Sequence, residues 1–330
     1  MLLLAYIVKR ILYMIPTLIL ISLVVFFIIQ LPPGDWLTSY IARLEMGDET
    51  ISAQRAEAMR VQYGLDQPKH VQFYQWVRNI IMNGDFGYSF EFNRPVSELI
   101  WERLLLTVVV TFTTLIFSWV VAFVIGLYSA THQYSFGDYI ASVVGFIGLA
   151  TPNFVLALVL MWIAFAYFGT SVTGLFFFFF VGEPWTTAKI VDMFKNMWIA
   201  IIVIGTASTA GLIRTLRANL LDELRKPYVV TAKSKGLSNL RVLLKYPLRI
   251  ALIPFISTVG WMLPTLVSGS EVTAMVLGLP TTGPMLLGAL RSQDMYLAGT
   301  FILLLSTLTV IGTLISDILL AVVDPRIRYE

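Results

Sequence analysis

The sequence predicts an all-α integral membrane protein that crosses the bilayer about six times. Of its 330 residues, 57% are hydrophobic and only 13% are charged, whereas charged residues make up about a quarter of an ordinary soluble domain. The mean hydropathy is +0.79. Long apolar stretches recur along the chain, and basic residues stand at their ends. Lipid is therefore the expected solvent for most of the protein.

Six apolar stretches are long enough to cross the hydrocarbon core, which takes roughly 20 helical residues rising about 1.5 Å each. They cover approximately residues 11–31, 104–129, 140–168, 197–213, 250–277 and 297–323. The first has the basic start of a signal peptide, but its apolar run is longer and no small-residue cleavage site follows. We expect it to remain as an anchor. Pro152 is expected to kink the third stretch.

The basic residues predict the orientation, because short loops rich in Lys and Arg stay in the cytoplasm. One loop, residues 214–249, dominates this signal. Its nine basic residues are Arg214, Arg217, Arg225, Lys226, Lys233, Lys235, Arg241, Lys245 and Arg249. Six spans and a cytoplasmic loop put both termini in the cytoplasm and residues 32–102 outside. A loop longer than about 60 residues crosses largely regardless of charge, so the arginines of this outer segment do not contradict the orientation.

The chain then divides into three parts. Residues 1–31 are an N-terminal tail with the first transmembrane helix, residues 32–102 are an extracytoplasmic segment, and residues 103–330 are a core of five transmembrane helices. Within the extracytoplasmic segment, residues 52–63 and 71–82 have helical spacing of apolar side chains. We expect two or three short helices there.

The segment after the third stretch is also apolar. No charged residue lies between Asp138 and Glu183, so residues 169–183 could be partly embedded in the membrane. The five consecutive phenylalanines from Phe176 to Phe180 could line a substrate path. An interfacial or lipid-facing role is favoured, because aromatic residues are enriched at the edges of bilayers.

The pattern of the basic loop predicts a short amphipathic helix. Tyr228, Thr231 and Ala232 fall on one side of it, and basic residues fall on the other. Gly236 ends the helix, as glycine commonly does at a C-terminal cap. Such a helix needs a partner, and the pattern fits an anionic lipid surface and a groove on a cytoplasmic protein equally well.

A series of short motifs resembles the permease subunits of binding-protein-dependent ABC importers, in particular the oligopeptide and dipeptide permease branch. The run from Tyr228 to Leu237, followed by Ala251 to Pro254, resembles the EAA loop of these permeases. The other matching motifs occur along nearly the whole chain: Leu31 to Asp35, Tyr63 to Pro68, Gly84 to Ser89, Arg94 to Val96, Thr151 to Phe154 and Asp324 to Tyr329. Each motif alone is weak, and their joint occurrence in this order is specific.

Two features depart from the pattern of this family. Val230 and Thr231 stand in place of the glutamate that names the EAA motif, as is usual in the peptide branch. After the fifth stretch, Ala274 and Met275 replace a Glu-Thr pair that is common in the branch. The resemblance implies import of a short peptide, and the second departure keeps an oligosaccharide open as the alternative substrate.

The resemblance also implies the architecture of a type I ABC importer permease in the inner (plasma) membrane of a prokaryote. The implied partners are a second homologous permease subunit, two ABC ATPase subunits and an extracytoplasmic substrate-binding protein. Coupling to the ATPases would run through residues 214–249. The residues implied in this coupling are Tyr228, Thr231, Ala232, Lys235, Gly236 and Leu237. The chain has no Gly-x-x-x-x-Gly-Lys-Ser/Thr loop, so ATP and Mg are expected only in the partner subunits.

The residue content argues against other classes of protein. With no cysteine and two histidines, thiolate metal sites are excluded, little remains for a histidine cluster, and no metal site is expected. No catalytic motif is present, so the chain is not expected to be an enzyme. The basic residues adjoin apolar stretches and do not indicate nucleic acid binding. An ion-driven secondary transporter is the main alternative class, although it usually has an inverted repeat and midplane ionisable groups.

Two acidic residues lie within the predicted spans, where an aspartate costs about 2.5 to 3.5 kcal/mol at a helix centre. Asp317, near the cytoplasmic end of the last span, is predicted to be a structural partner of an arginine or a backbone group rather than part of a proton relay. Glu271 could lie on the translocation path or mark the outer end of the fifth span, and the sequence favours neither.

Overall fold

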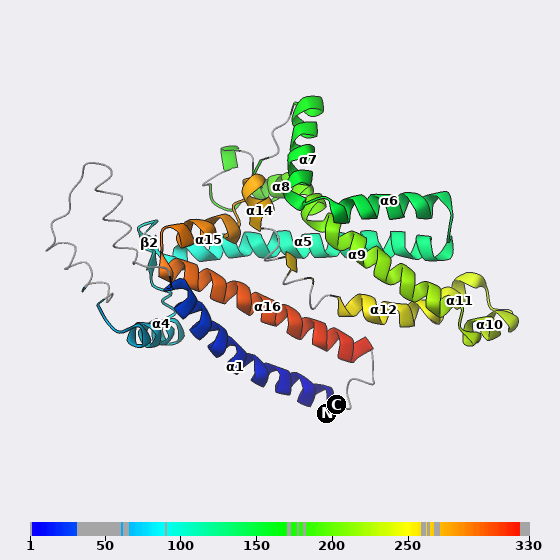
Figure 1. Ribbon diagram of the computed structural model, residues 1–330, viewed down its shortest axis with the longest axis horizontal. Coiled ribbons are helices and arrows are strands. Elements are labelled where there is room, and N and C mark those ends of the chain that lie inside the picture. The colour runs from blue at the N-terminus through cyan, green and yellow to red at the C-terminus, as the bar shows by residue number, and fades with distance from the viewer. Residues whose placement is uncertain are drawn as a thin grey trace. The chain divides into compact units, whose positions relative to one another are not determined.

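A computed structural model describes residues 2–31, 61, 66–89, 91–169, 173–176, 178–180, 183–258, 262, 265–266 and 271–323. These residues are mainly helical, as predicted (Figure 1). The helices are α1 (Leu2–Ile29), α4 (Lys69–Asn83), α5 (Val96–Thr131), α6 (Phe136–Ala150), α7 (Asn153–Phe168), α8 (Thr187–Asn196), α9 (Trp198–Leu224), α10 (Pro227–Ser234), α11 (Asn239–Lys245), α12 (Pro247–Ser257), α14 (Glu271–Val276), α15 (Thr282–Arg291) and α16 (Met295–Val323).

Short elements complete the described fold. The strands β1 (Tyr88–Ser89) and β2 (Arg94–Pro95) pair antiparallel, and η1 (Phe178–Phe180) is a single 3-10 turn within the phenylalanine run. The helix predicted at residues 71–82 is confirmed by α4. The one predicted at residues 52–63 lies outside the described residues, apart from residue 61.

Among the described residues, four helices are long and apolar enough to cross a membrane, and the number rises to five if one bent helix pair counts as a span. The four are Tyr6–Ile29, Val96–Thr131, Trp198–Leu224 and Met295–Leu319, which match the first, second, fourth and sixth predicted stretches. The fifth predicted stretch, residues 250–277, is represented by α12 and α14. Most of the residues between those two helices are outside the described part of the chain.

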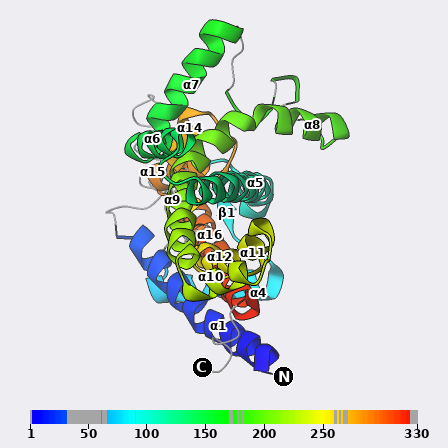
Figure 2. The ribbon, with the colours of Figure 1, turned by 90° about the vertical axis from the view of Figure 1, so that its right-hand side faces the viewer.

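The third predicted stretch, residues 140–168, is broken rather than continuous. Its two halves, α6 and α7, meet at an angle of 109° across Thr151 and Pro152. Pro152 directly precedes the first turn of α7, where a residue without an N–H costs no helical hydrogen bond. The kink predicted at Pro152 is present, and the single span predicted there is replaced by two helices that point in different directions (Figure 2).

The fourth predicted stretch also differs, because the helix does not end with the apolar run at residue 213. α9 continues to Leu224, through the first part of the basic loop. Leu216 and Leu220 are fully buried on this extension. Charged residues thus end the apolar run without ending the helix, since the leucines keep one face of α9 in the protein interior.

The chain forms two compact units. The larger comprises Met1–Arg10, Val108–Pro280 and Thr309–Glu330, and the smaller comprises Ile11–Thr107 and Thr281–Leu308. Within the larger unit, α9 is central and packs against α6, α7 and α12, and both views show α6 and α12 beside it (Figures 1 and 2).

Small residues allow α9 to approach its neighbours closely. A Cβ added at Gly148 of α6 would lie 2.5 Å from Cγ2 of Thr206, and one added at Gly205 would lie 2.9 Å from Oγ of Ser118. The Ser118 hydroxyl donates a hydrogen bond of 3.2 Å to the Gly205 carbonyl. Such contacts are typical of helix packing in membranes, where small side chains bring backbones together.

In the smaller unit, aromatic side chains join α1 and α4. The ring of Phe26 stacks on Trp76 with centroids 5.7 Å apart and meets Phe73 edge-on at 5.3 Å. Gly299 of α16 faces the same indole, because an added Cβ there would lie 3.5 Å from Trp76. Helix α4 is thereby fixed against the ends of two long helices.

A buried aspartate organises the β1–β2 hairpin of the smaller unit. Asp294 is completely buried and accepts a 2.6 Å hydrogen bond from the Ser89 hydroxyl. Its carboxylate also accepts from the backbone N–H groups of Glu91, at 3.2 Å, and of Leu297, at 3.2 Å. The last contact caps the start of α16, so one side chain ties the hairpin to that helix.

The segment before α8 closes around a buried lysine. The ammonium of Lys189 donates a 2.6 Å hydrogen bond to the Glu183 carbonyl, and it lies 5.0 Å from the ring centres of both Phe176 and Trp185. Lys189 is only 2% exposed. Two aromatic faces and a carbonyl replace water around this charge, as in a cation–π site.

Candidate docking site in the basic loop

The second half of the basic loop folds into a small helical module, residues 225–246, which we call the basic module. Pro227 opens α10 at a position where the missing N–H is tolerated. The Lys235 N–H donates to the Thr231 carbonyl at 3.1 Å, and the Gly236 N–H donates to the Lys233 carbonyl at 2.9 Å. These bonds close the last turn of α10.

Gly236 directly follows this turn in a left-handed conformation, with φ of 78°. This confirms the predicted end of the helix, since glycine adopts such a conformation without a steric cost. An added Cβ at Gly236 would meet nothing within 4 Å. Glycine is therefore favoured at this position by the left-handed backbone conformation and not by a lack of space for a side chain.

A small apolar core holds α10 and α11 together. It consists of the buried residues Val229, Ala232 and Val242 and the partly buried residues Tyr228, Leu237 and Tyr246. Ala232 is 6% exposed and belongs to this internal core. Of the apolar residues implied in coupling to an ATPase, Ala232 thus faces inward, while Tyr228 and Leu237 pack against the core from its edge.

A polar contact ties the basic module to the end of α9. The Tyr228 hydroxyl donates a hydrogen bond to the Glu223 carboxylate, and Lys226 lies 3.9 Å from the same carboxylate. Burial of the Tyr228 hydroxyl, followed by its bond to Glu223, raises its pKa above the usual value. Tyr228 therefore stays protonated as a donor, and α10 is fixed to the helix from which the chain enters the module.

The surface of α10 carries the remaining predicted residues. Thr231, Lys235 and Gly236 are all exposed, and the Thr231 hydroxyl bonds back to the Pro227 carbonyl at 3.0 Å. These three residues lie along the last turn and its cap. They form an open, partly basic face beside the exposed backbone of the turn.

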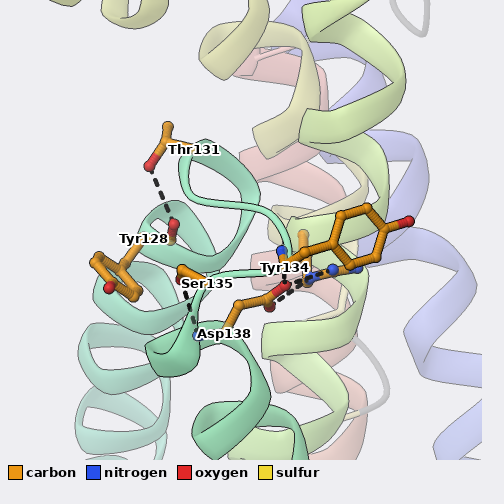
Figure 3. Close-up of polar contacts among 6 residues, drawn as sticks. Tyr128, Thr131, Tyr134, Ser135 and Asp138 are labelled. Carbon is orange, nitrogen blue, oxygen red and sulfur yellow. Dashed lines mark hydrogen bonds and ion pairs between the residues drawn. The ribbon is translucent and has the colours of Figure 1, made fainter.

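A second polar contact, which was not predicted from the sequence, fixes α9 to α6. The Arg217 guanidinium donates from Nε to Oδ1 of Asp138 at 2.9 Å and from Nη2 to Oδ2 at 2.8 Å. Figure 3 shows Asp138 in the first turn of α6. Its carboxylate also accepts from the Tyr134 N–H at 3.0 Å. The hydroxyl of Ser135 accepts from the Asp138 N–H at 3.2 Å and caps α6. A two-point pair of this kind fixes both distance and orientation.

Asp317 and Glu271, the two acidic residues of the predicted spans, are placed differently. Asp317 lies 3.2 Å from Arg10 of α1, so the structure pairs it with an arginine. Glu271 is half-buried at the first residue of α14, which packs against α7 and α9. Figure 1 shows α14 near α7, at the end of α9 opposite to α10. Glu271 is therefore not part of the basic module.

Within the described ranges, no group of three or more His, Asp or Glu side chains is arranged to hold a metal ion.

The long apolar helices and the basic module at the end of α9 and α12 together define a multispanning helical membrane protein with a structured, positively charged loop.

Comparison with known sequences identifies the family. Residues 122–329 match the family described as binding-protein-dependent transport system inner membrane component, and residues 3–111 match the N-terminal region of such membrane components. The chain belongs to this family. It is a multi-pass inner membrane protein of a transport system that includes a substrate-binding protein and an ATPase.

Relatives with assigned names match the chain over nearly its full length. It is 36% identical to the oligopeptide transport system permease protein AppB of Bacillus subtilis over 326 residues, which are 98% of this chain and 99% of the relative. It is 32% identical to the glutathione transport system permease protein GsiC of Salmonella typhimurium over 325 residues, with the same coverage. The GsiC protein of Escherichia coli K12 is 31% identical over 325 residues, again covering 98% and 99%.

Proposed function

We propose that this chain forms half of the translocation pathway of an ATP-driven importer for short peptides. The observation that carries the proposal is the full-length similarity to permeases named for oligopeptides and for glutathione. Glutathione is a tripeptide, so both names describe short peptides. The oligosaccharide alternative rests on the replacement of the Glu-Thr pair by Ala274 and Met275, and the relatives reported above lend it no support.

The proposed complex contains this chain, a second homologous permease and two ATPase subunits, with a substrate-binding protein on the outer side. ATP and Mg bind in the ATPases, which carry out the hydrolysis. The basic module faces the cytoplasm, since short loops rich in basic residues remain there, and both termini lie on the same side. Residues 32–102 then lie outside, where they can meet the binding protein.

Coupling to the ATPases is proposed to run through the basic module. The exposed residues Thr231, Lys235 and Gly236 offer the docking face, and Tyr228, Ala232 and Leu237 support it from within the module. Because Tyr228 is bonded to Glu223 at the end of α9, a displacement of α10 is passed to that helix. Ligand-driven closure of a partner can then favour one arrangement of the spans over another.

The first experiment is purification of the tagged complex from its native membrane, followed by reconstitution into vesicles. We expect a second multispanning chain and ATPases to co-purify, and labelled short peptide to enter the vesicles only with ATP and the binding protein. Uptake of oligosaccharide but not peptide would refute the substrate assignment. Uptake driven by an ion gradient without ATP would refute the importer and support the secondary transporter.

The role of α10 is tested by Gly236→Asp, with Gly84→Asp as a matched control. Both glycines follow a helix in a left-handed conformation, with φ of 78° and 63°, and an added Cβ meets nothing within 4 Å at either. Backbone strain is therefore similar, and only the first change places a carboxylate on the proposed docking face. We expect Gly236→Asp to reduce ATPase co-purification and uptake about tenfold or more, the equivalent of about 1.4 kcal/mol in binding. Equal behaviour of the two variants would contradict the docking role.

A further inference from the structure

Two exposed leucines on α11 have no role in the proposed docking of α10. Leu240 is 66% exposed and Leu244 is 51% exposed. They lie four residues apart, so they share one face of the helix. Val242, midway between them, is buried in the core that α11 shares with α10. At about 100° per residue, both leucines point about 160° away from Val242, on the opposite side of α11 from α10.

The flank of this face is basic, and acidic residues are absent from the surrounding sequence. Arg241 and Lys245 are exposed and also lie four residues apart on α11. No Asp or Glu occurs between Glu223 and Glu271, whereas seven basic residues do. A partner that fits this surface offers negative charge to the basic residues and, beneath that charge, an apolar layer to the leucines.

The chain holds α11 close to the membrane boundary. Tyr246 alone separates α11 from α12, and α12 packs along the spanning helix α9. Arg249 is the last charged residue before the apolar stretch that reaches Glu271. It lies four residues beyond Lys245, and a chain of that length spans at most about 14 Å even when extended. The ammonium of Lys245 lies 5.8 Å from the ring centre of Tyr246, and tyrosine is enriched at membrane–water interfaces.

We propose that α11 is an interfacial helix that binds anionic lipid on the leaflet facing the basic module. Leu240 and Leu244 insert between lipid headgroups and acyl chains, and Arg241 and Lys245 bind lipid phosphates. α10, on the other side of the shared core, remains free for a protein partner. The sequence left an anionic lipid surface and a groove on a cytoplasmic protein as alternative partners of the basic loop. In this proposal α11 binds the lipid surface and α10 binds the groove. This inference does not depend on the transported substrate.

The absence of cysteine from the sequence allows a direct test. Leu240→Cys and Leu244→Cys are each labelled with a fluorophore in the purified complex and reconstituted into bilayers that contain doxyl-labelled lipid, with and without anionic lipid. Val230→Cys on α10 is the matched control, since Val230 is 59% exposed. The same complex with the unsubstituted chain supplies the background from other subunits.

We expect doxyl lipid to reduce the fluorescence at positions 240 and 244 by roughly half, more strongly with anionic lipid, and to leave position 230 unchanged. The double change Arg241→Gln and Lys245→Gln should remove the dependence on anionic lipid. Labels at 240 and 244 that respond to aqueous iodide and not to doxyl lipid would overturn the proposal. Labels protected from both quenchers would also overturn it, because they would place this face of α11 against a protein. Peptide uptake, measured separately, reports the proposed function independently.

Discussion

Replacement of Arg217 by Met tests the contact between α9 and α6. The Asp138 side chain is only 4% exposed, whereas that of Arg217 is 27% exposed. Arg217→Met therefore leaves a buried carboxylate without its cation, and loss of one partner from a buried pair costs about 3 to 5 kcal/mol. Asp138→Asn leaves the charge on the more exposed partner, which water can reach, so we expect a smaller cost of about 1 to 2 kcal/mol.

Thermal unfolding of the purified complex measures this difference. In a large domain, each kcal/mol shifts Tm by roughly 2 to 4 °C, so Arg217→Met should lower Tm by roughly 6 to 20 °C. The double variant Asp138→Asn with Arg217→Met should recover more than half of this loss, because it no longer buries an unpaired charge. The pair would then show a clear non-additive energy, as expected for directly interacting residues.

Arg214→Met is the matched control on the same helix. Arg214 lies about one turn earlier in α9, and its guanidinium is 5.2 Å from the ring centre of Phe146. A cation over an exposed ring contributes about 0.5 to 1 kcal/mol, so its loss should lower Tm by only a few degrees. If Arg217→Met and Arg214→Met shift Tm equally, or if the double variant is as unstable as the sum of the single changes, the argument from the buried pair is refuted.

Three further changes probe other contacts. Tyr228→Phe removes the bond to Glu223, worth about 1 kcal/mol, and should lower the peptide imported per ATP hydrolysed while the complex still assembles; an unchanged ratio would contradict this route. Ser89→Ala removes a donor from the buried carboxylate of Asp294, so Tm should fall by roughly 2 to 8 °C. Lys189→Met removes the cation from its aromatic site, and backbone hydrogen exchange of residues 183–189 should become faster; unchanged exchange would show that the ammonium does not order this segment.

The sequence predicted the features that depend on local chemistry. Apolar runs located the long helices, the helical spacing of apolar side chains located α4, and Gly236 marked the end of α10. These predictions succeeded because each depends on neighbours in the chain. The proposed functional roles of the residues in the basic module came from the family resemblance, and they remain predictions.

Features that depend on distant residues were not predicted. The pair Arg217 and Asp138 joins residues far apart in the sequence. Arg217 was interpreted only as one of the basic residues of the cytoplasmic loop, and Asp138 only as the start of a segment without charge. The spacing did contain one signal for Arg217. It lies one residue after Leu216 and three before Leu220, so it borders the buried face of α9. The 109° angle between α6 and α7 was also missed, because hydropathy records how much apolar chain is present and not its direction.

The length of α9 has a mechanical consequence. Its 27 residues run without interruption from Trp198 to Leu224, which corresponds to about 40 Å, or about 10 Å more than the hydrocarbon core. An unbroken helix of this length acts as a lever. A tilt of only about 10° about one end displaces the other by about 7 Å. A modest rotation imposed at Leu224 can therefore shift the segment around Trp198 by more than the height of a helical turn.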